Sequence, residues 1–184
     1  MGLRTPRLRF KSGRARLFMY YETLSSGYEA LHREEQLHKL RLIRENIQLH
    51  GDERILDVGC GPCWSRELFP NVVGVDPVLY NEHIIQASAE SIPFPAQSFD
   101  IILCVTTIHH FELDKALAEM KRVAKNDALF VITVLKKASL FHRIVEQLQQ
   151  EFGTLLETDG TQDNILFLVS KQHQTNHPLV STKL

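Results

Sequence analysis

One short segment, ILDVGCGPCWSREL at residues 55–68, contains two motifs that are typical of reactive or ligand-binding sites. Cys60 and Cys63 form a Cys-x-x-Cys dithiol, a spacing that is typical of thiol–disulfide exchange. The same segment contains DVGCG, which is the opening of a nucleotide-binding loop. One short loop cannot easily serve both chemistries, so the rest of the sequence has to decide between them.

The glycine loop is followed by an apolar segment that ends in an acidic residue. Gly59 and Gly61 let the backbone turn tightly and approach a ligand without a side chain in the way. Asp76 ends the segment NVVGVD, and a carboxylate there can accept two hydrogen bonds from a ribose diol. The order strand, glycine turn, helix, strand and acid therefore predicts a nucleoside site at the carboxyl ends of parallel strands.

Two residues of the loop argue against a dinucleotide. The dinucleotide fingerprint has a third glycine where Trp64 stands, and an indole there would obstruct a pyrophosphate. Asp57 precedes the glycines and would repel a phosphate at the turn. S-adenosyl-L-methionine carries a sulfonium and an ammonium group, so we expect it as the cofactor. A nicotinamide-dependent oxidoreductase is the disfavoured alternative.

Alternating strands and helices must position these residues. Apolar residues at three- and four-residue steps predict helices over 29–51, 112–125 and 139–153, and a helix start over 63–69. The side chains expected to face inward in the first and last of these are Leu37, Leu40, Ile43, Ile47, Leu140, Ile144, Val145 and Leu148. Gly153 is expected to end the last helix.

Short apolar runs predict the strands, at residues 54–59, 71–76, 83–88, 99–106, 128–135, 154–158 and 165–170. The last two runs flank the turn-rich DGTQDN and predict a hairpin that inserts one antiparallel strand. The predicted fold is α/β, Rossmann-like and doubly wound, with a mainly parallel seven-stranded sheet, a C-terminal antiparallel hairpin and helices on both faces.

The composition describes one ordinary globular domain with enough apolar content for a full core. A formal net charge of −1 gives no general argument for nucleic-acid binding. The longest apolar run, ALFVITVL, is far shorter than the roughly 18 residues of a transmembrane helix. Three cysteines cannot form a fully paired disulfide framework, so we expect a reducing, cytoplasmic compartment.

Both ends of the chain differ from its middle. Residues 1–18 carry basic side chains and no acidic one, which predicts a disordered basic extension. An Arg-rich, acid-free start is also typical of a mitochondrial transit peptide, so a mitochondrial location is the alternative. The polar residues 171–184 predict a flexible tail, which leaves residues 19–170 as the folded domain.

Several segments together resemble the class I S-adenosylmethionine-dependent methyltransferases, and specifically the methyltransferase type 11, or UbiE-like, group. These segments are LDVGCG, VVGVDP, AESIPFPAQSFDIILCVTTIHHF and ALAEMKRVAK followed by LFVITV. The run that ends in IHHF is the most specific of them. The resemblance implies a methyl transfer from S-adenosyl-L-methionine and extends over residues 19–170.

The resemblance also implies roles for individual residues. The cofactor-binding residues that it implies are Tyr20, Tyr28, Asp57, Gly59, Cys60, Gly61, Asp76, Ser88, Ala89, Glu90 and Thr106. The glycine loop would line the methionine end, Asp76 would hold the ribose, and Thr106 would lie near the transferring methyl. Tyr20, Tyr28 and the neighbouring Tyr21 would cover the cofactor. His109 and His110 would border the acceptor pocket and are the candidate catalytic bases.

Three departures from the family pattern have expected consequences. Cys63 stands where the family usually has a third glycine, and Ser88 stands where it usually has an aspartate. The segment 77–87 is too short for the usual helix and strand. We therefore expect that helix to be reduced to a turn, with a more open adenine pocket and modest or partner-dependent affinity.

The motifs do not identify the methyl acceptor, which stays open between a small molecule, tRNA and protein. The alternative function is a non-catalytic or partner-activated S-adenosylmethionine-binding subunit, because some small enzymes of this resemblance act with an activator subunit. His and Cys residues show no spacing typical of zinc, so we expect no metal. We expect no membrane partner.

Redox catalysis by the dithiol is disfavoured, because a thioredoxin-like chain would need neither the glycine loop nor Asp76. Both sulfurs are still expected at the start of a helix, where the pKa of a thiol falls. We therefore expect oxidation of Cys60 and Cys63 to impair cofactor binding reversibly.

Overall fold

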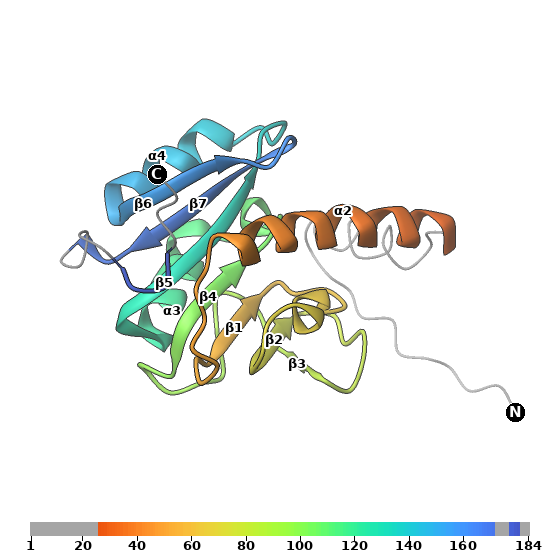
Figure 1. Cartoon of the computed structure of the whole chain (residues 1–184), viewed down its shortest axis with the longest axis horizontal. Helices are drawn as coiled ribbons and strands as arrows, with labels where there is room; N and C mark the ends of the chain where they lie inside the picture. Colours follow the sequence, from red (N-terminus) through yellow and green to blue (C-terminus); the bar gives the residue numbers. More distant parts are fainter. Residues whose placement is uncertain (1–25, 172–176, 181–184) are drawn as a thin grey trace, which may run out of the picture. The chain divides into compact units, whose positions relative to one another are not determined.

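The computed structural model describes residues 26–171 and 177–180, with side chains from residue 32 onward (Figure 1). The chain divides into two units after Glu35, inside helix α2 (Ser26–Glu45), and the whole sheet belongs to the second unit. The basic extension predicted for residues 1–18 lies outside the described residues, and so do residues 19–25 of the predicted domain. No helix of the described part is long and apolar enough to cross a membrane.

Seven strands form one sheet in the order β3-β2-β1-β4-β5-β7-β6. The strands are β1 Ile55–Val58, β2 Val72–Asp76, β3 Ile84–Gln86, β4 Phe99–Cys104, β5 Ala124–Leu135, β6 Gly153–Asp159 and β7 Asp163–Val169. Strands β1 to β5 pair in parallel, whereas β7 pairs antiparallel with both β5 and β6. The predicted fold, including one inserted antiparallel strand, is confirmed.

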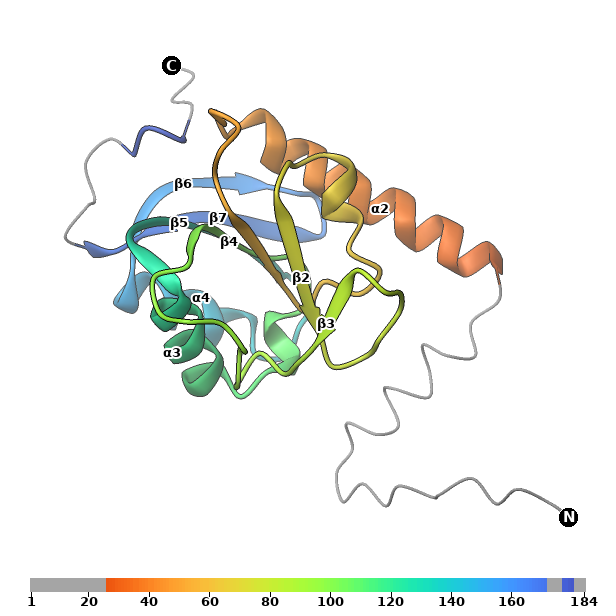
Figure 2. The same cartoon turned by 90° about the horizontal axis from the view of Figure 1, so that it is seen from below.

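Helices cover both faces of the sheet. The face packed by α3 (Leu113–Val123) and α4 (Phe141–Glu151) buries one cluster of apolar side chains. Figure 2 shows these two helices together on the same side of the strands. The opposite face buries a second cluster, which includes Leu37, Leu40 and Ile43 from the C-terminal half of α2. The inward stripe predicted for this helix is confirmed at these three residues. The predicted end at residue 51 is wrong, because α2 ends at Glu45, and the buried Ile47 lies beyond it in an isolated β-bridge.

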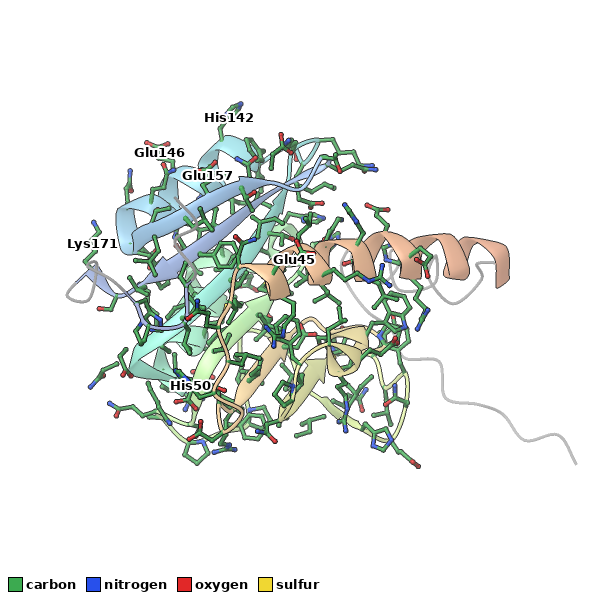
Figure 3. All side chains as sticks on the ribbon, in the orientation of Figure 1. Glu45, His50, His142, Glu146, Glu157 and Lys171 are labelled. Atoms are coloured by element: carbon green, nitrogen blue, oxygen red, sulfur yellow. The ribbon has the colours of Figure 1, made fainter. Side chains whose placement is uncertain are left out.

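The predicted face of α4 is correct except at its first residue. Ile144 and Leu148 are buried, whereas Leu140 is 47% exposed and stands before the helix as its N-cap. Leu140 precedes the first helical turn, so the helical period does not fix its direction. Figure 3 shows His142 and Glu146 pointing outward from α4, on the side away from the sheet.

Two other local predictions are wrong. The helix expected over 63–69 is only a four-residue 3-10 helix, Trp64–Glu67, preceded by a left-handed Cys63 as its N-cap. Gly153 does not end α4 but begins β6, and Phe152 is the C-cap. The turn expected in place of a helix between β2 and β3 is confirmed.

Part of the C-terminal segment packs on the domain. Leu179 is 6% exposed and joins the second apolar cluster, and its carbonyl accepts a hydrogen bond from Gln48 N–H at 2.8 Å. Val180 forms an isolated β-bridge with Ile47. The prediction of a flexible tail over 171–184 is therefore wrong for residues 177–180, because burial of an apolar side chain opposes fraying.

Candidate active site

The loops that follow β1, β2, β3 and β4 meet at one edge of the sheet, because these strands run in parallel. Strand order reverses between β1 and β4, which is where ligands bind in doubly wound folds. The 3-10 helix η2 (Ile108–His110) follows β4 at the same edge. The sequence-predicted residues after position 50 all fall in these loops or at the ends of these strands.

The glycine turn after β1 is tightly enclosed at its first position. Gly59 has φ +72°, and a Cβ built there would lie 2.8 Å from Thr107 Oγ1 and 2.9 Å from Phe111 Cζ. Gly61 has φ +53°, but a Cβ there would meet nothing within 4 Å. Both positions need glycine for their backbone angles, and only Gly59 also needs it for space.

The two glycines allow a matched test. We expect Gly59→Ala to lower the free energy of unfolding by about 2–3 kcal/mol, because left-handed strain adds to the clash with Thr107 and Phe111. Gly61→Ala should cost only about 1 kcal/mol, since strain acts there alone. Urea unfolding of both variants measures the difference, and equal losses would contradict the enclosed position of Gly59.

Asp57 brings an acid into the interior beside the loop. Its side chain is buried and accepts a hydrogen bond from Ser65 Oγ at 2.5 Å. No basic side chain of the described residues pairs with Asp57. Burial raises the pKa of Asp57 to about 6, and the hydrogen bond from Ser65 opposes this shift in part. A buried carboxylate without a cationic partner suits a positively charged ligand.

The raised pKa of Asp57 predicts a pH-dependent stability difference. An acid whose folded pKa lies above its unfolded value stabilises the fold at low pH, and this contribution is lost as the pH rises from about 4 to 6. We therefore expect Asp57→Asn to become more stable than the unaltered chain above pH 6, by up to about 3 kcal/mol. Thermal unfolding from pH 4 to pH 7 measures this, and a constant difference between the two proteins would contradict it.

Asp76 connects β2 to the glycine turn. Its Oδ2 accepts a hydrogen bond from Gly61 N–H at 2.8 Å, and its Oδ1 accepts one from Val78 N–H at 2.8 Å. Burial raises the pKa of Asp76, while these two backbone hydrogen bonds act in the opposite direction. The acid at the end of β2 is thus fixed against the loop that follows β1.

The three residues predicted beside the adenine have distinct surroundings. Ser88 Oγ is hydrogen-bonded to Glu90 Oε2, and Glu90 Oε1 accepts a hydrogen bond from Glu112 N–H at 2.8 Å. Glu90 therefore links the loop after β3 to the start of α3. Ala89 is 4% exposed and belongs to the apolar core, so its methyl group points away from this edge's surface.

Thr106 follows β4 in a strained conformation. Its φ is +62°, which is unfavourable for a β-branched residue, and its N–H donates to Thr133 Oγ1 at 2.7 Å. Lys39 Nζ donates to Thr106 Oγ1 at 3.2 Å and lies 2.6 Å from Asp163 Oδ2. Lys39 is 1% exposed and Asp163 is fully buried, so an internal ion pair fixes the residue predicted near the transferring methyl.

The two candidate bases differ in their surroundings. His109 Nδ1 is buried without a hydrogen-bond partner among the described residues, whereas His110 is exposed. Their rings are 4.0 Å apart. Burial lowers the pKa of His109 to about 4, and the positive charges of a protonated His110 and of Lys39 contribute. His109 is therefore neutral near pH 7 and can accept a hydrogen bond through Nδ1.

The sequence interpretation missed several residues that hold this edge together, namely Lys39, Ser65, Thr107, Thr133 and Asp163. Only Lys39 could have been found from the sequence, because it is a charged residue between Leu37 and Leu40 on the apolar face of α2. Tyr20 and Tyr21 lie outside the described residues. Tyr28 lies in α2, and its side chain is also outside the described part.

Residues 56–132 match the family described as the methyltransferase domain. This segment, which runs from β1 into β5, is therefore similar to a methyltransferase domain. An uncharacterized methyltransferase of Bacillus subtilis, YcgJ, is 32% identical to this chain over 138 residues, which cover 62% of this chain and 54% of that protein. The chain spans about half the length of the curated relatives that it matches at 32% identity.

Solved structures with low identity share the methyltransferase fold. A Burkholderia thailandensis 1,6-didemethyltoxoflavin-N1-methyltransferase, solved with S-adenosylhomocysteine, has a TM-score of 0.65 at 14% identity and covers 91% of this chain and 93% of that chain. A complex between the Haloferax volcanii Trm112 methyltransferase activator and a methyltransferase has a TM-score of 0.63 at 12% identity, covering 79% and 94%. At these low identities, the similarities show only that the folds are alike.

Proposed function

We propose that this chain transfers a methyl group from S-adenosyl-L-methionine to an acceptor by in-line displacement. The observation that carries the proposal is the contact between the glycine turn and Asp76, through the hydrogen bond from Gly61 N–H. It sets an acid at the end of β2 beside a turn in which backbone can approach a ligand. The family match and the buried Asp57 favour a cationic nucleoside over a dinucleotide.

The residues of the edge fit the methyl donor. Asp57 would attract its ammonium group, Gly59 and Gly61 would let its methionine end approach the backbone, and Asp76 would accept hydrogen bonds from its ribose. When bound, the donor supplies a methyl group that the sulfonium already activates. The protein has to orient the acceptor and exclude water, and such orientation contributes several of the roughly 7–11 kcal/mol available from proximity.

His109 is proposed to orient the acceptor. Its neutral ring can accept a hydrogen bond from a hydroxyl or amine of the acceptor through the buried Nδ1. A base with a pKa near 4 removes a proton poorly at pH 7, so positioning is its expected contribution rather than full proton abstraction. Ser88, Ala89 and Glu90 would contact the adenine mainly through their backbone, because their side chains already have internal partners.

Replacement of the two histidines separates their roles. We expect His109→Phe to lower methyl transfer about 10²-fold, the lower end of the range for a positioned acid or base, with donor affinity unchanged. His110→Phe is the matched control and should change transfer by less than about threefold, because its ring is exposed. Equal losses in both variants would contradict the assignment of His109.

The function is tested by transfer of a radiolabelled methyl group. The full chain is incubated with labelled donor and with RNA, protein and small-molecule fractions of the source cell, alone and with cell extract as a source of an activator subunit. Incorporation into one fraction that is lost in Asp76→Ala supports the proposal. Donor binding without incorporation into any fraction would favour a non-catalytic subunit instead.

A further inference from the structure

Cys60 and Cys63 place their sulfur atoms over one point of the sheet. A Cβ built on Gly74 of β2 would lie 2.6 Å from each Sγ, so the sulfurs are separated by at most twice that distance. The glycine at 74 makes the room that both sulfurs occupy. A hydrogen bond from Cys63 N–H to Cys60 C=O at 2.9 Å closes the turn between them. Such a turn keeps the two Cα atoms within about 7 Å, close to the range of a disulfide.

Cys63 occupies a backbone conformation that suits glycine better. Its φ of +61° and ψ of +48° are left-handed, which costs a non-glycine residue about 1 kcal/mol or more. Glycine would adopt these angles without strain. The cysteine at this position supplies a sulfur atom next to Cys60, which glycine could not supply. The backbone strain at Cys63 therefore accompanies the presence of a thiol pair.

The two thiols differ in exposure and in acidity. Cys60 is partly exposed, whereas Cys63 is 3% exposed. The hydrogen bond from Cys60 lowers the pKa of Cys63, and the same hydrogen bond together with burial raises the pKa of Cys60. The lowered pKa expected from the sequence for both thiols is therefore wrong for Cys60. Cys104 is buried apart from them with its pKa raised to about 12, so it is an unreactive internal control.

We propose that Cys60 and Cys63 form a reversible disulfide modification site that controls the cofactor loop. The proposal rests on the proposed function, because it assigns that loop to the methyl donor. A low-molecular-weight disulfide such as oxidised glutathione is the oxidant. Cys60 is the more exposed of the two thiols; it loses its proton, its sulfur attacks the glutathione disulfide to form a mixed disulfide, and the released glutathione thiolate takes up the proton. The Cys63 thiolate then attacks the Cys60 sulfur, forms the internal disulfide and releases the second glutathione.

The disulfide would act on the donor site through the residue between the thiols. Gly61 lies inside the ring that the disulfide closes, and its N–H is bonded to Asp76. An S–S bond is about 2.05 Å long, so the two sulfurs must leave their packed positions over Gly74. The turn contracts with them, which shifts Gly61 away from Asp76 and disturbs both the methionine and ribose ends of the site.

The test compares the full chain in reduced and oxidised glutathione buffers. We expect peptide mass mapping to show a Cys60–Cys63 disulfide, with Cys104 still free. Calorimetric titration should show S-adenosylhomocysteine binding about tenfold weaker or more after oxidation, and full recovery with dithiothreitol. Cys63→Gly removes the resolving thiol while favouring the native turn, so its affinity in the reduced buffer should be within about threefold of the reduced chain, and mass mapping after oxidation should show glutathione on Cys60 and no internal disulfide.

Each contrary result has a distinct meaning. Failure to form the disulfide at any glutathione ratio would overturn the modification site, and so would a disulfide that leaves the affinity unchanged. Loss of affinity on oxidation of Cys63→Gly in protein whose Cys60 carries no glutathione would also overturn it, by assigning the effect to other residues. Absence of S-adenosylhomocysteine binding in the reduced, folded chain would overturn the proposed function and, with it, the control of that site.

Discussion

Lys39→Met is expected to lower the free energy of unfolding by about 3–5 kcal/mol, the cost of leaving one partner of a buried ion pair alone. Lys39 is 1% exposed, and its Nζ lies 2.6 Å from Asp163 Oδ2. Neither carboxylate oxygen of Asp163 has another hydrogen-bond partner among the described residues. The methionine keeps most of the volume of the lysine, so the loss measures charge rather than a cavity. Urea unfolding followed by circular dichroism measures it.

A double variant shows whether the pair is the cause. Lys39→Met combined with Asp163→Asn removes both charges, and we expect it to be more stable than Lys39→Met alone by about 2 kcal/mol or more. If Lys39→Met alone fails to fold, a folded double variant would still show that the unpaired charge of Asp163 is the cause. Lys39→Met with a loss below about 1 kcal/mol, or additive losses in the double variant, would contradict a coupled buried pair.

Asp76→Ala is expected to weaken S-adenosylhomocysteine binding about 100-fold. Under the proposed function, the carboxylate accepts two hydrogen bonds from the ribose, and each hydrogen bond to a charged group contributes about 1.5–3 kcal/mol. The substitution also releases Gly61 N–H, which Asp76 holds at 2.8 Å. Asp76→Asn keeps one acceptor oxygen and should lose only about tenfold. Calorimetric titration of each variant measures the affinities.

Asp52→Ala is the matched control for the lost charge. Asp52 is an exposed acid that precedes β1, at the opposite edge of the sheet from the candidate site. Its replacement should leave the affinity within about twofold, because an exposed charge more than a Debye length away is screened. A similar loss of affinity in both variants would show that general charge, rather than contact with Asp76, determines binding.

The sequence was sufficient to predict the sheet because its strands are short apolar runs at the expected spacing. Burial on both faces leaves residues 101–104 of β4 and 128–135 of β5 almost wholly apolar, which is typical of central parallel strands. The hairpin that inserts β7 followed from the turn-rich DGTQDN, although Asp163 in that segment belongs to the strand. The positions of Gly59, Asp76 and Thr106 at one edge follow from topology alone.

The contacts within the site could not be predicted in the same way. Ser65 meets Asp57 only because the loop after β1 turns back through a left-handed Cys63, a conformation that sequence patterns do not favour. Lys39 and Asp163 are 124 positions apart, and no local rule pairs them. The segment 63–69 has helical apolar spacing, but only Trp64–Glu67 form a helix, and it is a 3-10 helix.

The central claim, that the edge formed by the β1 loop and Asp76 binds S-adenosyl-L-methionine, is tested most directly by equilibrium binding to the reduced full chain. Calorimetric titration with S-adenosylhomocysteine is predicted to show one saturable site per chain, whereas NAD should produce no binding because Trp64 stands at the third glycine position of the dinucleotide fingerprint. No saturable binding at millimolar S-adenosylhomocysteine, or tighter binding of NAD, would contradict the account.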